Sequence, residues 1–199
     1  MQKLILASGS PRRVELLRLI GIEAEVVRCD VPEQPGAGES PAAYSRRVAR
    51  AKASAGREAY AQQFDRLVLG ADTEVLLDGH VFGKPQDAQD AMKMLALLSG
   101  REHEVLSSVA LIGPAFDEVI SCSTAVRFAK LSQGAMEAYV ASGEPFGKAG
   151  AYAIQGRAAT FIEHIHGSYW SVMGLPLFET AALLRRAGFC WESPAPLEQ

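Results

Sequence analysis

The fold of this chain is decided by the stretch Leu4-Ile5-Leu6-Ala7-Ser8-Gly9-Ser10-Pro11-Arg12-Arg13. Its first four residues are an apolar run, which predicts a short buried strand. Ser10 is a favourable N-cap residue, and Pro11 suits the first helical position, so a helix is expected to begin there. Apolar residues at helical spacing then continue as far as Gly21, which is expected to end the helix. A strand that leads through a tight loop into a helix is typical of α/β enzymes.

The rest of the chain alternates strand and helix signals, which also favours an α/β fold. Strands are expected at 67–71, 74–77, 104–112, 118–130 and 158–165, and helices at 41–62, 87–98, 133–142 and 177–187. Asp78-Gly79 is typical of a hairpin turn. We expect a single domain at residues 1–190, built as two lobes on one sheet system, and a loose tail at 191–199.

Composition and charge exclude several classes of protein. The chain has 199 residues, of which 48% are apolar and 22% charged, as in a soluble globular protein. Its formal charge of −3 gives no general attraction to a nucleic-acid polymer. The three cysteines have no CxxC spacing, so we expect neither a zinc site nor a disulfide framework. Without a signal sequence or a long apolar segment, we expect no membrane association and a cytoplasmic location.

The loop at the start of the first helix is a candidate anion site. Ser8 and its small neighbours would let a ligand approach the free N–H groups of the helix, and Arg12 and Arg13 add two guanidinium groups. A polyphosphate is the expected anion. The pattern is equally compatible with a capped helix that carries two solvated arginines.

Acidic residues supply the next candidates. In Gly70-Ala71-Asp72-Thr73, Asp72 is expected at the carboxyl end of a buried strand, where ligands of α/β sheets bind. There it would hold a metal ion or act as a general base on water, whereas the alternative is a turn aspartate. Glu33, in an acidic loop, is a second candidate metal ligand.

Two lysines and one glutamine complete the candidate set. Lys52 lies in a helix whose arginines we interpret as a solvated face, and Lys84 lies between Gly and Pro in a short loop, which suits a phosphate contact. The glycine-rich segment 147–156 is expected to close over a ligand. Within it, Gln155 would read a base edge or, alternatively, make ordinary loop hydrogen bonds.

Together these motifs resemble the Maf family over nearly the whole chain, from Leu4 to about Gly188. The resemblance is carried, in order, by Ser8-Gly9-Ser10-Pro11-Arg12-Arg13, Glu33, Lys52, Gly70-Ala71-Asp72-Thr73, Gly83-Lys84-Pro85, Gly150-Ala151-Tyr152-Ala153-Ile154-Gln155-Gly156 and Gly167-Ser168-Tyr169 with Gly174-Leu175-Pro176. It implies a mixed central sheet flanked by helices, with two lobes and a cleft, similar to the inosine-triphosphate pyrophosphatases.

The resemblance also implies roles for individual residues. Asp72 matches the proton acceptor, and Lys52 and Lys84 match phosphate-side lysines. Glu33 matches a metal-side acid, with Mg²⁺ or Mn²⁺ as the implied cofactor. The positions linked to substrate choice are matched by Arg12, Thr73 and Gln155. The last two imply the branch of the family that acts on dTTP and UTP.

The implied activity is hydrolysis of dTTP and UTP, or of modified pyrimidine triphosphates, to the monophosphate and pyrophosphate, as a house-cleaning of the nucleotide pool. A homodimer is expected from the resemblance alone. Two alternatives remain: a nucleotide-sensing regulator of cell division without significant turnover, and an inosine-triphosphate pyrophosphatase. Turnover of UTP and of ITP separates the three.

Overall fold

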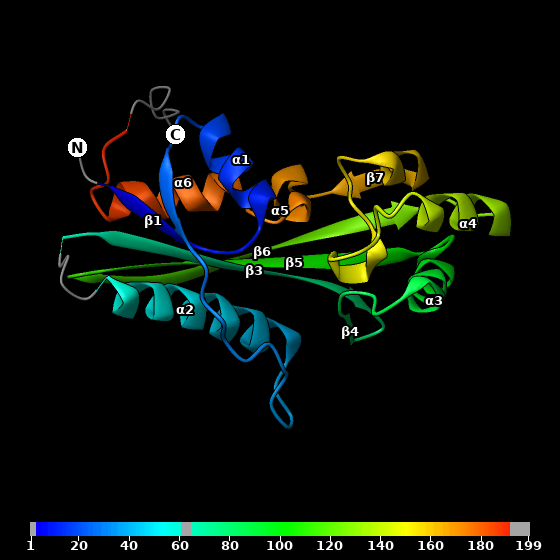
Figure 1. Cartoon of the computed structure of the whole chain (residues 1–199), viewed down its shortest axis with the longest axis horizontal. Helices are drawn as coiled ribbons and strands as arrows, with labels where there is room; N and C mark the ends of the chain where they lie inside the picture. Colours follow the sequence, from blue (N-terminus) through cyan, green and yellow to red (C-terminus); the bar gives the residue numbers. More distant parts are fainter. Residues whose placement is uncertain (1–2, 61–64, 192–199) are drawn as a thin grey trace.

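The computed structural model describes residues 3–60 and 65–191. Within them the chain forms a seven-stranded sheet with helices on both faces (Figure 1). In chain order the elements are β1 Leu4–Ala7, α1 Pro11–Leu19, β2 Ala24–Val27, α2 Pro41–Ala59, β3 Leu67–Leu77, β4 His80–Phe82, α3 Ala88–Leu98, β5 Glu102–Gly113, β6 Phe116–Phe128, α4 Gln133–Ala141, the 3₁₀ turns η1 Ala149–Ala151 and η2 Arg157–Phe161, β7 Ile162–His166, α5 Tyr169–Met173 and α6 Leu177–Arg186.

The sheet is mixed, as expected from the sequence. Its strand order is β2-β1-β3-β5-β6-β7, with β4 paired to β3. The strands β2, β1 and β3 are parallel to one another, whereas every pairing from β3 through β5 and β6 to β7 is antiparallel. Figure 1 shows α2 on one side of the sheet, with α1 and α6 on the other.

Strand β3 carries two short neighbours on one edge and leaves a gap between them. Its residues Leu67–Gly70 pair with β1, and its residues Val75–Leu77 pair with β4 on the same edge. The opposite edge pairs continuously with β5 from Val68 to Leu76. Residues 71–74 therefore remain in the strand but have no neighbouring strand on the first edge. The edge of β3 is open there, in the middle of the sheet.

On one face of β3, two large hydrophobic cores lie on either side of this gap. Leu69 and Ala71 belong to a core that includes residues of α1 and α6. Val75 and Leu77 belong to a second core, which includes residues of α3 and α4. Since alternate residues of a strand share a face, Thr73 lies on this face between the two cores. The cores correspond to the two lobes expected from the sequence.

Helix α2 packs unusually close to β3 because small residues meet at the contact. A Cβ atom built on Gly70 would lie 2.6 Å from the Ala53 backbone nitrogen and closer still to the Ala49 carbonyl oxygen. One turn further along, a Cβ on Gly56 would lie 2.8 Å from Val68. The helix therefore lies with its backbone almost in contact with the sheet, which places its side chains at the gap.

Several expected elements differ from the structure. Residues 67–71 and 74–77 form one continuous strand, because pairing with β5 continues after β1 has ended. The expected strand at 158–165 is a 3₁₀ turn followed by β7. The sequence analysis also missed β2, a short and half-exposed edge strand, and α5. Helix α2 ends at Ala59, and the expected end at Gln62 lies outside the described residues.

The expected loose tail is described only at its first residue. Trp191 donates a hydrogen bond from Nε1 to the Ile20 carbonyl oxygen at 3.0 Å and packs against the first core. Residues 192–199 lie outside the described part of the chain, so the tail stays a prediction. Among the described helices, none has the length and apolar character needed to cross a membrane.

The close contact at Gly70 leads to a stability prediction. Gly70→Ala is expected to lower the free energy of unfolding by ~1–3 kcal/mol, because the added methyl group meets helix backbone and forces α2 away from the sheet. Gly134→Ala in α4 is the matched control, since a Cβ there meets nothing within 4 Å and alanine is the better helix former, by ~0.5–1 kcal/mol. Urea unfolding of both variants measures the difference. A Gly70→Ala variant as stable as the wild type would contradict the packing described.

Candidate active site

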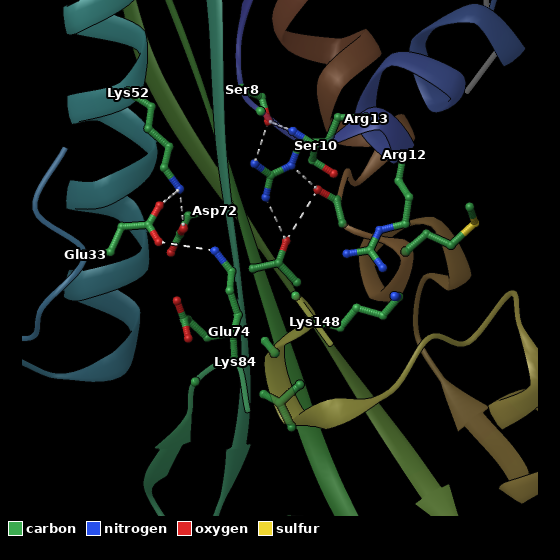
Figure 2. Close-up of a pocket in the computed structure, with 18 of the residues that line it drawn as sticks. Ser8, Ser10, Arg12, Arg13, Glu33, Lys52, Asp72, Glu74, Lys84 and Lys148 are labelled. Carbon is green, nitrogen blue, oxygen red and sulfur yellow. Dashed lines mark hydrogen bonds and ion pairs between the residues drawn. The ribbon is translucent and has the colours of Figure 1, made fainter. Parts of the chain in front are cut away.

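A cleft of about 890 Å³ opens at the gap in the edge of β3. Its walls come from the loop after β1, from α1 and α2, from the middle of β3, from the loop after β4 and from residues 147–155. Figure 2 shows the labelled side chains converging on this cleft from these separate elements. The cleft brings together every candidate residue singled out in the sequence: Ser8, Arg12, Arg13, Glu33, Lys52, Asp72, Thr73, Lys84 and Gln155.

Lys52 forms the centre of one wall. Its Nζ atom lies 2.9 Å from Asp72 Oδ1 and 2.6 Å from Glu33 Oε1, and only 11% of its side chain is exposed. Glu33 also lies 3.6 Å from Lys84 Nζ (Figure 2). The low exposure strengthens these attractions relative to surface ion pairs, so the lysine holds both carboxylates in fixed positions.

One oxygen of Asp72 accepts no N–H or hydroxyl group. Its Oδ2 atom is buried and has no hydrogen-bond partner among the described residues. Asp72 lies within β3 rather than at a strand end or in a turn, so both positions considered for it from the sequence are corrected. A buried, unpartnered carboxylate oxygen is a strong acceptor for a proton or a hard cation.

Glu74 lies two residues further along β3, on the same face as Asp72. It is 8% exposed, and burial, the charge of Asp72 and a hydrogen bond between the two carboxyl groups raise its pKa to about 8. At neutral pH Glu74 is therefore mostly uncharged. The sequence analysis missed it, because its burial follows from the length of β3, which the local pattern did not reveal.

A buried arginine of α1, Arg13, lies against the opposite face of β3. Arg13 donates from Nε to the Gly174 carbonyl oxygen at 2.9 Å and from Nη1 to Ser8 Oγ at 3.1 Å. Its Nη2 atom lies 3.4 Å from Thr73 Oγ1, and Thr73 in turn lies 2.9 Å from Ser107 Oγ. The pKa of Arg13 is lowered by burial, and the charge of Asp72 offsets part of that shift. Arg13 thus joins the loop after β1 to β3 and to the segment after α5.

Two further cations, Arg12 and Lys148, line the cleft. Arg12 makes no hydrogen bond or ion pair with the described residues, and burial lowers its pKa. Lys148 lies across from it in Figure 2 and donates to the Glu144 carbonyl oxygen at 2.6 Å. Burial, followed by the charge of Arg12, lowers the pKa of Lys148. Two like charges in a half-buried position favour an anion between them.

The loop before α1 leaves its helix end open. Ser10 occupies the N-cap position with extended backbone, but its side chain makes no capping hydrogen bond, contrary to expectation. Its backbone N–H donates instead to Ser8 Oγ at 3.2 Å. In the first turn of α1, Pro11 has no N–H group and the Arg13 N–H donates to the Ser10 carbonyl oxygen at 3.2 Å. The Arg12 N–H is therefore the helix-end donor left without an acceptor among the described residues.

The segment expected to close over a ligand is firmly packed. Ala151 and Tyr152 are buried in the second core, and Tyr152 hydrogen bonds to His103 at 2.9 Å between its hydroxyl and Nε2. Gln155 is exposed and lines the cleft. The segment is therefore a fixed wall rather than a lid, because its apolar residues contribute to the core.

The acidic residues of the cleft offer few ligands for a divalent metal ion. Within residues 3–60 and 65–191, no group of three or more His, Cys, Asp or Glu side chains is arranged to hold a metal ion. The free Oδ2 of Asp72 suits Mg²⁺ or Mn²⁺, which often take one or two carboxylates and complete their shell with substrate phosphate and water. Glu33 contacts Lys52 and Lys84 in the structure, and its metal-side role stays a prediction.

Comparison with known proteins gives a consistent result. The family described as Maf-like protein matches residues 3–187. A protein of Chromobacterium violaceum named dTTP/UTP pyrophosphatase is 49% identical, over 94% of this chain and 96% of its own length. A Bordetella pertussis protein of the same name is 53% identical, with 94% and 93% covered. The solved structure of the Staphylococcus aureus Ham1 protein is 14% identical, covering 80% of this chain and 91% of its own, with a TM-score of 0.45.

The raised pKa of Glu74 leads to a prediction about stability and pH. In the unfolded chain this carboxyl ionises near 4.5, whereas in the folded chain it holds its proton up to about 8. The folded state thus binds one more proton between these values, and the free energy of unfolding should fall as the pH rises through this window. Glu74→Gln removes this dependence, so its stability relative to the wild type should improve from pH 5 to pH 8. Urea titrations in metal-free buffer measure it, and a constant difference would contradict the assignment.

Proposed function

Because the chain belongs to the Maf family, we propose that it hydrolyses dTTP and UTP to the nucleoside monophosphate and pyrophosphate. Relatives about half identical over nearly the full chain carry the name dTTP/UTP pyrophosphatase. The observation that carries the proposal is the free oxygen of Asp72, which Lys52 fixes at the edge of a cleft lined by cations. This arrangement combines a proton acceptor with sites for a polyphosphate.

The triphosphate is proposed to lie across the cations of the cleft. Arg12 and the open helix end offer donors on one side, and Lys84 offers an exposed ammonium group on the other. Ser8 and Arg13 are already bonded to one another and give this surface a fixed shape. A triphosphate placed here replaces repulsion among the cations with attraction, which favours binding without a covalent bond.

The proposed reaction is attack of water on the α-phosphorus. Asp72 accepts the proton of the water, while Lys52 holds its carboxylate in place through Oδ1. The bond between the α-phosphorus and the bridging oxygen breaks, and pyrophosphate leaves. Arg12, Lys84 and the helix end stabilise the charge that develops on the leaving group.

A divalent cation is part of the proposal, on the strength of the free Asp72 oxygen and the resemblance. Asp72 is proposed to hold Mg²⁺ or Mn²⁺, with Glu33 as a second acid on that side. The ion would supply neutralisation of phosphate charge when bound. The neutral form of Glu74 limits repulsion in this region, since only one of the two carboxyls on this face of β3 is then ionised.

Base choice is proposed to depend on residues from α1, β3 and the segment after η1. Arg12, Thr73 and Gln155 match the family positions linked to substrate choice, and all three line the cleft. The Gln155 amide offers one donor and one acceptor, which match O4 and N3–H of uracil and thymine. We propose both normal and modified pyrimidine triphosphates as substrates, in a house-cleaning role.

The proposal also includes an oligomeric state, a location in the cell and a kind of partner. A homodimer is proposed from the family resemblance alone. A cytoplasmic location is proposed from the three cysteines, which are far apart in the sequence and lack CxxC spacing. The formal charge of −3 supports a free nucleotide rather than a nucleic-acid polymer as partner. No contact with a membrane is proposed.

Removal of the proposed base should abolish most turnover. Asp72→Asn preserves the shape of the side chain but not its proton affinity, so kcat for UTP should fall by ~10² or more. Asp78→Asn is the matched control: this aspartate lies in the exposed β3–β4 turn, pairs with Arg101, and should leave kcat unchanged. Release of pyrophosphate with Mg²⁺ or Mn²⁺ is the measurement. An Asp72→Asn enzyme of nearly wild-type rate would refute the mechanism.

The same assay separates the alternatives. UTP should give UMP and pyrophosphate, whereas UDP and orthophosphate would show attack at the γ-phosphorus. Binding of UTP without release of pyrophosphate at any enzyme concentration would identify a nucleotide sensor. A preference for ITP over UTP would identify a purine enzyme.

Base choice provides a separate prediction. Gln155→Glu replaces the donor of the amide with a second acceptor, which then faces the acceptor at O4. We expect kcat/KM for dTTP and UTP to fall, and their advantage over CTP to narrow by roughly tenfold or more. Parallel measurements with the three nucleotides test this. An equal fall for all three would show that Gln155 supports the wall of the cleft and does not read the base.

A further inference from the structure

We propose that Glu144, which does not line the cleft, is a positioning residue that holds Gln155 in the orientation needed to select uracil and thymine. The inference rests on the proposed function. It starts from the observation that Gln155 itself is poorly held. Its side chain is exposed and makes no hydrogen bond with the described residues, so its direction depends on the backbone that carries it.

The Glu144 carboxylate binds the backbone directly after Gln155. Its Oε2 atom accepts the Arg157 N–H at 3.0 Å, and its Oε1 atom accepts the Ala158 N–H at 3.4 Å. Oε1 also accepts the hydroxyl of Tyr139 at 3.0 Å. Three donors from two separate segments therefore converge on one side chain.

Tyr139 extends this contact to the backbone before Gln155. Its hydroxyl oxygen accepts the buried Ala153 N–H at 3.2 Å while its O–H donates to Glu144. The chain is thus held two residues before Gln155 and two residues after it. The two anchor points are joined through the tyrosine hydroxyl and the single carboxylate of Glu144.

Gly156 brings this carboxylate into contact with the backbone. A Cβ atom built on Gly156 would lie only 2.6 Å from Glu144 Oε2, and its other two nearest neighbours are also atoms of that carboxyl group. Only a residue without a side chain fits here while the carboxylate keeps its hydrogen bonds. The position of the Glu144 carboxylate therefore requires glycine next to Gln155.

The carboxylate is ionised in this position. Burial opposes its ionisation, but the hydrogen bonds from Arg157, Tyr139 and Ala158 outweigh that effect and lower the pKa of Glu144. Hydrogen bonds to a charged acceptor are stronger than those between neutral groups. Glu144 is thus the strongest available acceptor for the N–H groups that follow Gln155.

Glu144 also contacts the phosphate side of the cleft. Its backbone carbonyl oxygen accepts Lys148 Nζ at 2.6 Å, and Lys148 lies across from Arg12 (Figure 2). Because this contact uses the backbone, a side-chain substitution leaves it available. The carboxylate can therefore be tested separately from the lysine.

The test compares selectivity rather than activity alone. Glu144→Ala and Glu144→Gln are measured with UTP, dTTP and CTP, beside Gln155→Ala and the double variant Glu144→Ala/Gln155→Ala. Glu137→Ala is the matched control, since this glutamate lies on α4 and, among the described residues, its side chain accepts a hydrogen bond from Gln133 alone. Partial unfolding lowers kcat/KM for all nucleotides by the same factor, so the UTP-to-CTP ratio reports positioning and not the amount of folded enzyme.

We expect Glu144→Ala to lower the UTP-to-CTP ratio of kcat/KM by roughly tenfold, close to the ratio of Gln155→Ala. The double variant should show no further loss, because both substitutions remove the same interaction. Glu144→Gln keeps one acceptor oxygen but turns an NH₂ group toward an N–H donor, so an intermediate ratio is expected. Glu137→Ala should keep the wild-type ratio.

A wild-type ratio in both Glu144 variants would overturn the inference and leave the proposed function standing. Additive losses in the double variant would overturn it too, because Glu144 would then act independently of Gln155. If the wild-type protein releases no pyrophosphate, the proposed function fails instead. The ratio of UTP to CTP affinity, measured by calorimetry on the same variants, then decides the inference by itself.

Discussion

The close contact between α2 and β3 is the constraint on which the candidate site depends. Glycine at position 70 and small residues on the helix let the two backbones meet. Lys52 lies on the same turn of α2. A larger separation would carry its ammonium group away from Asp72 and Glu33, which it now holds at 2.9 Å and 2.6 Å. A packing requirement in the core therefore determines the electrostatics of the cleft.

Strand β3 presents different side chains to the two faces of the sheet, because its residues alternate in direction. Asp72 and Glu74 lie on the face that meets α2, where the lysine and the raised pKa of Glu74 limit the charge of the acidic group. Thr73 lies on the opposite face and contacts Arg13. Because neighbouring residues of one strand lie on different faces, a substitution at Asp72 and one at Thr73 change separate sets of contacts. The roles proposed for the two faces, proton transfer and substrate choice, can therefore be tested by separate substitutions.

The sequence predicted the local motifs but not the features created by distant pairing. The strand, loop and helix from Leu4 onward were predicted correctly, since their signals are local. The burial of Glu74 was not, because it depends on β5 extending β3 beyond the end of β1. Lys148 and Glu144 were also missed as site residues, since their contacts with the cleft and with residues 153–158 exist only after folding. The roles assigned to the candidate residues stay predictions.

One continuous strand spans both lobes, and this has a consequence for how a ligand is received. β3 pairs with β5 without interruption from one core to the other, past the cleft at residues 71–74. Rotation of one lobe against the other would have to break the hydrogen bonds between β3 and β5, so the sheet resists this movement. The backbone at the floor of the cleft is then ordered when the chain folds, and little backbone entropy remains to be lost there on association. Affinity in such a receptor is set by how well the ligand matches a shape that already exists.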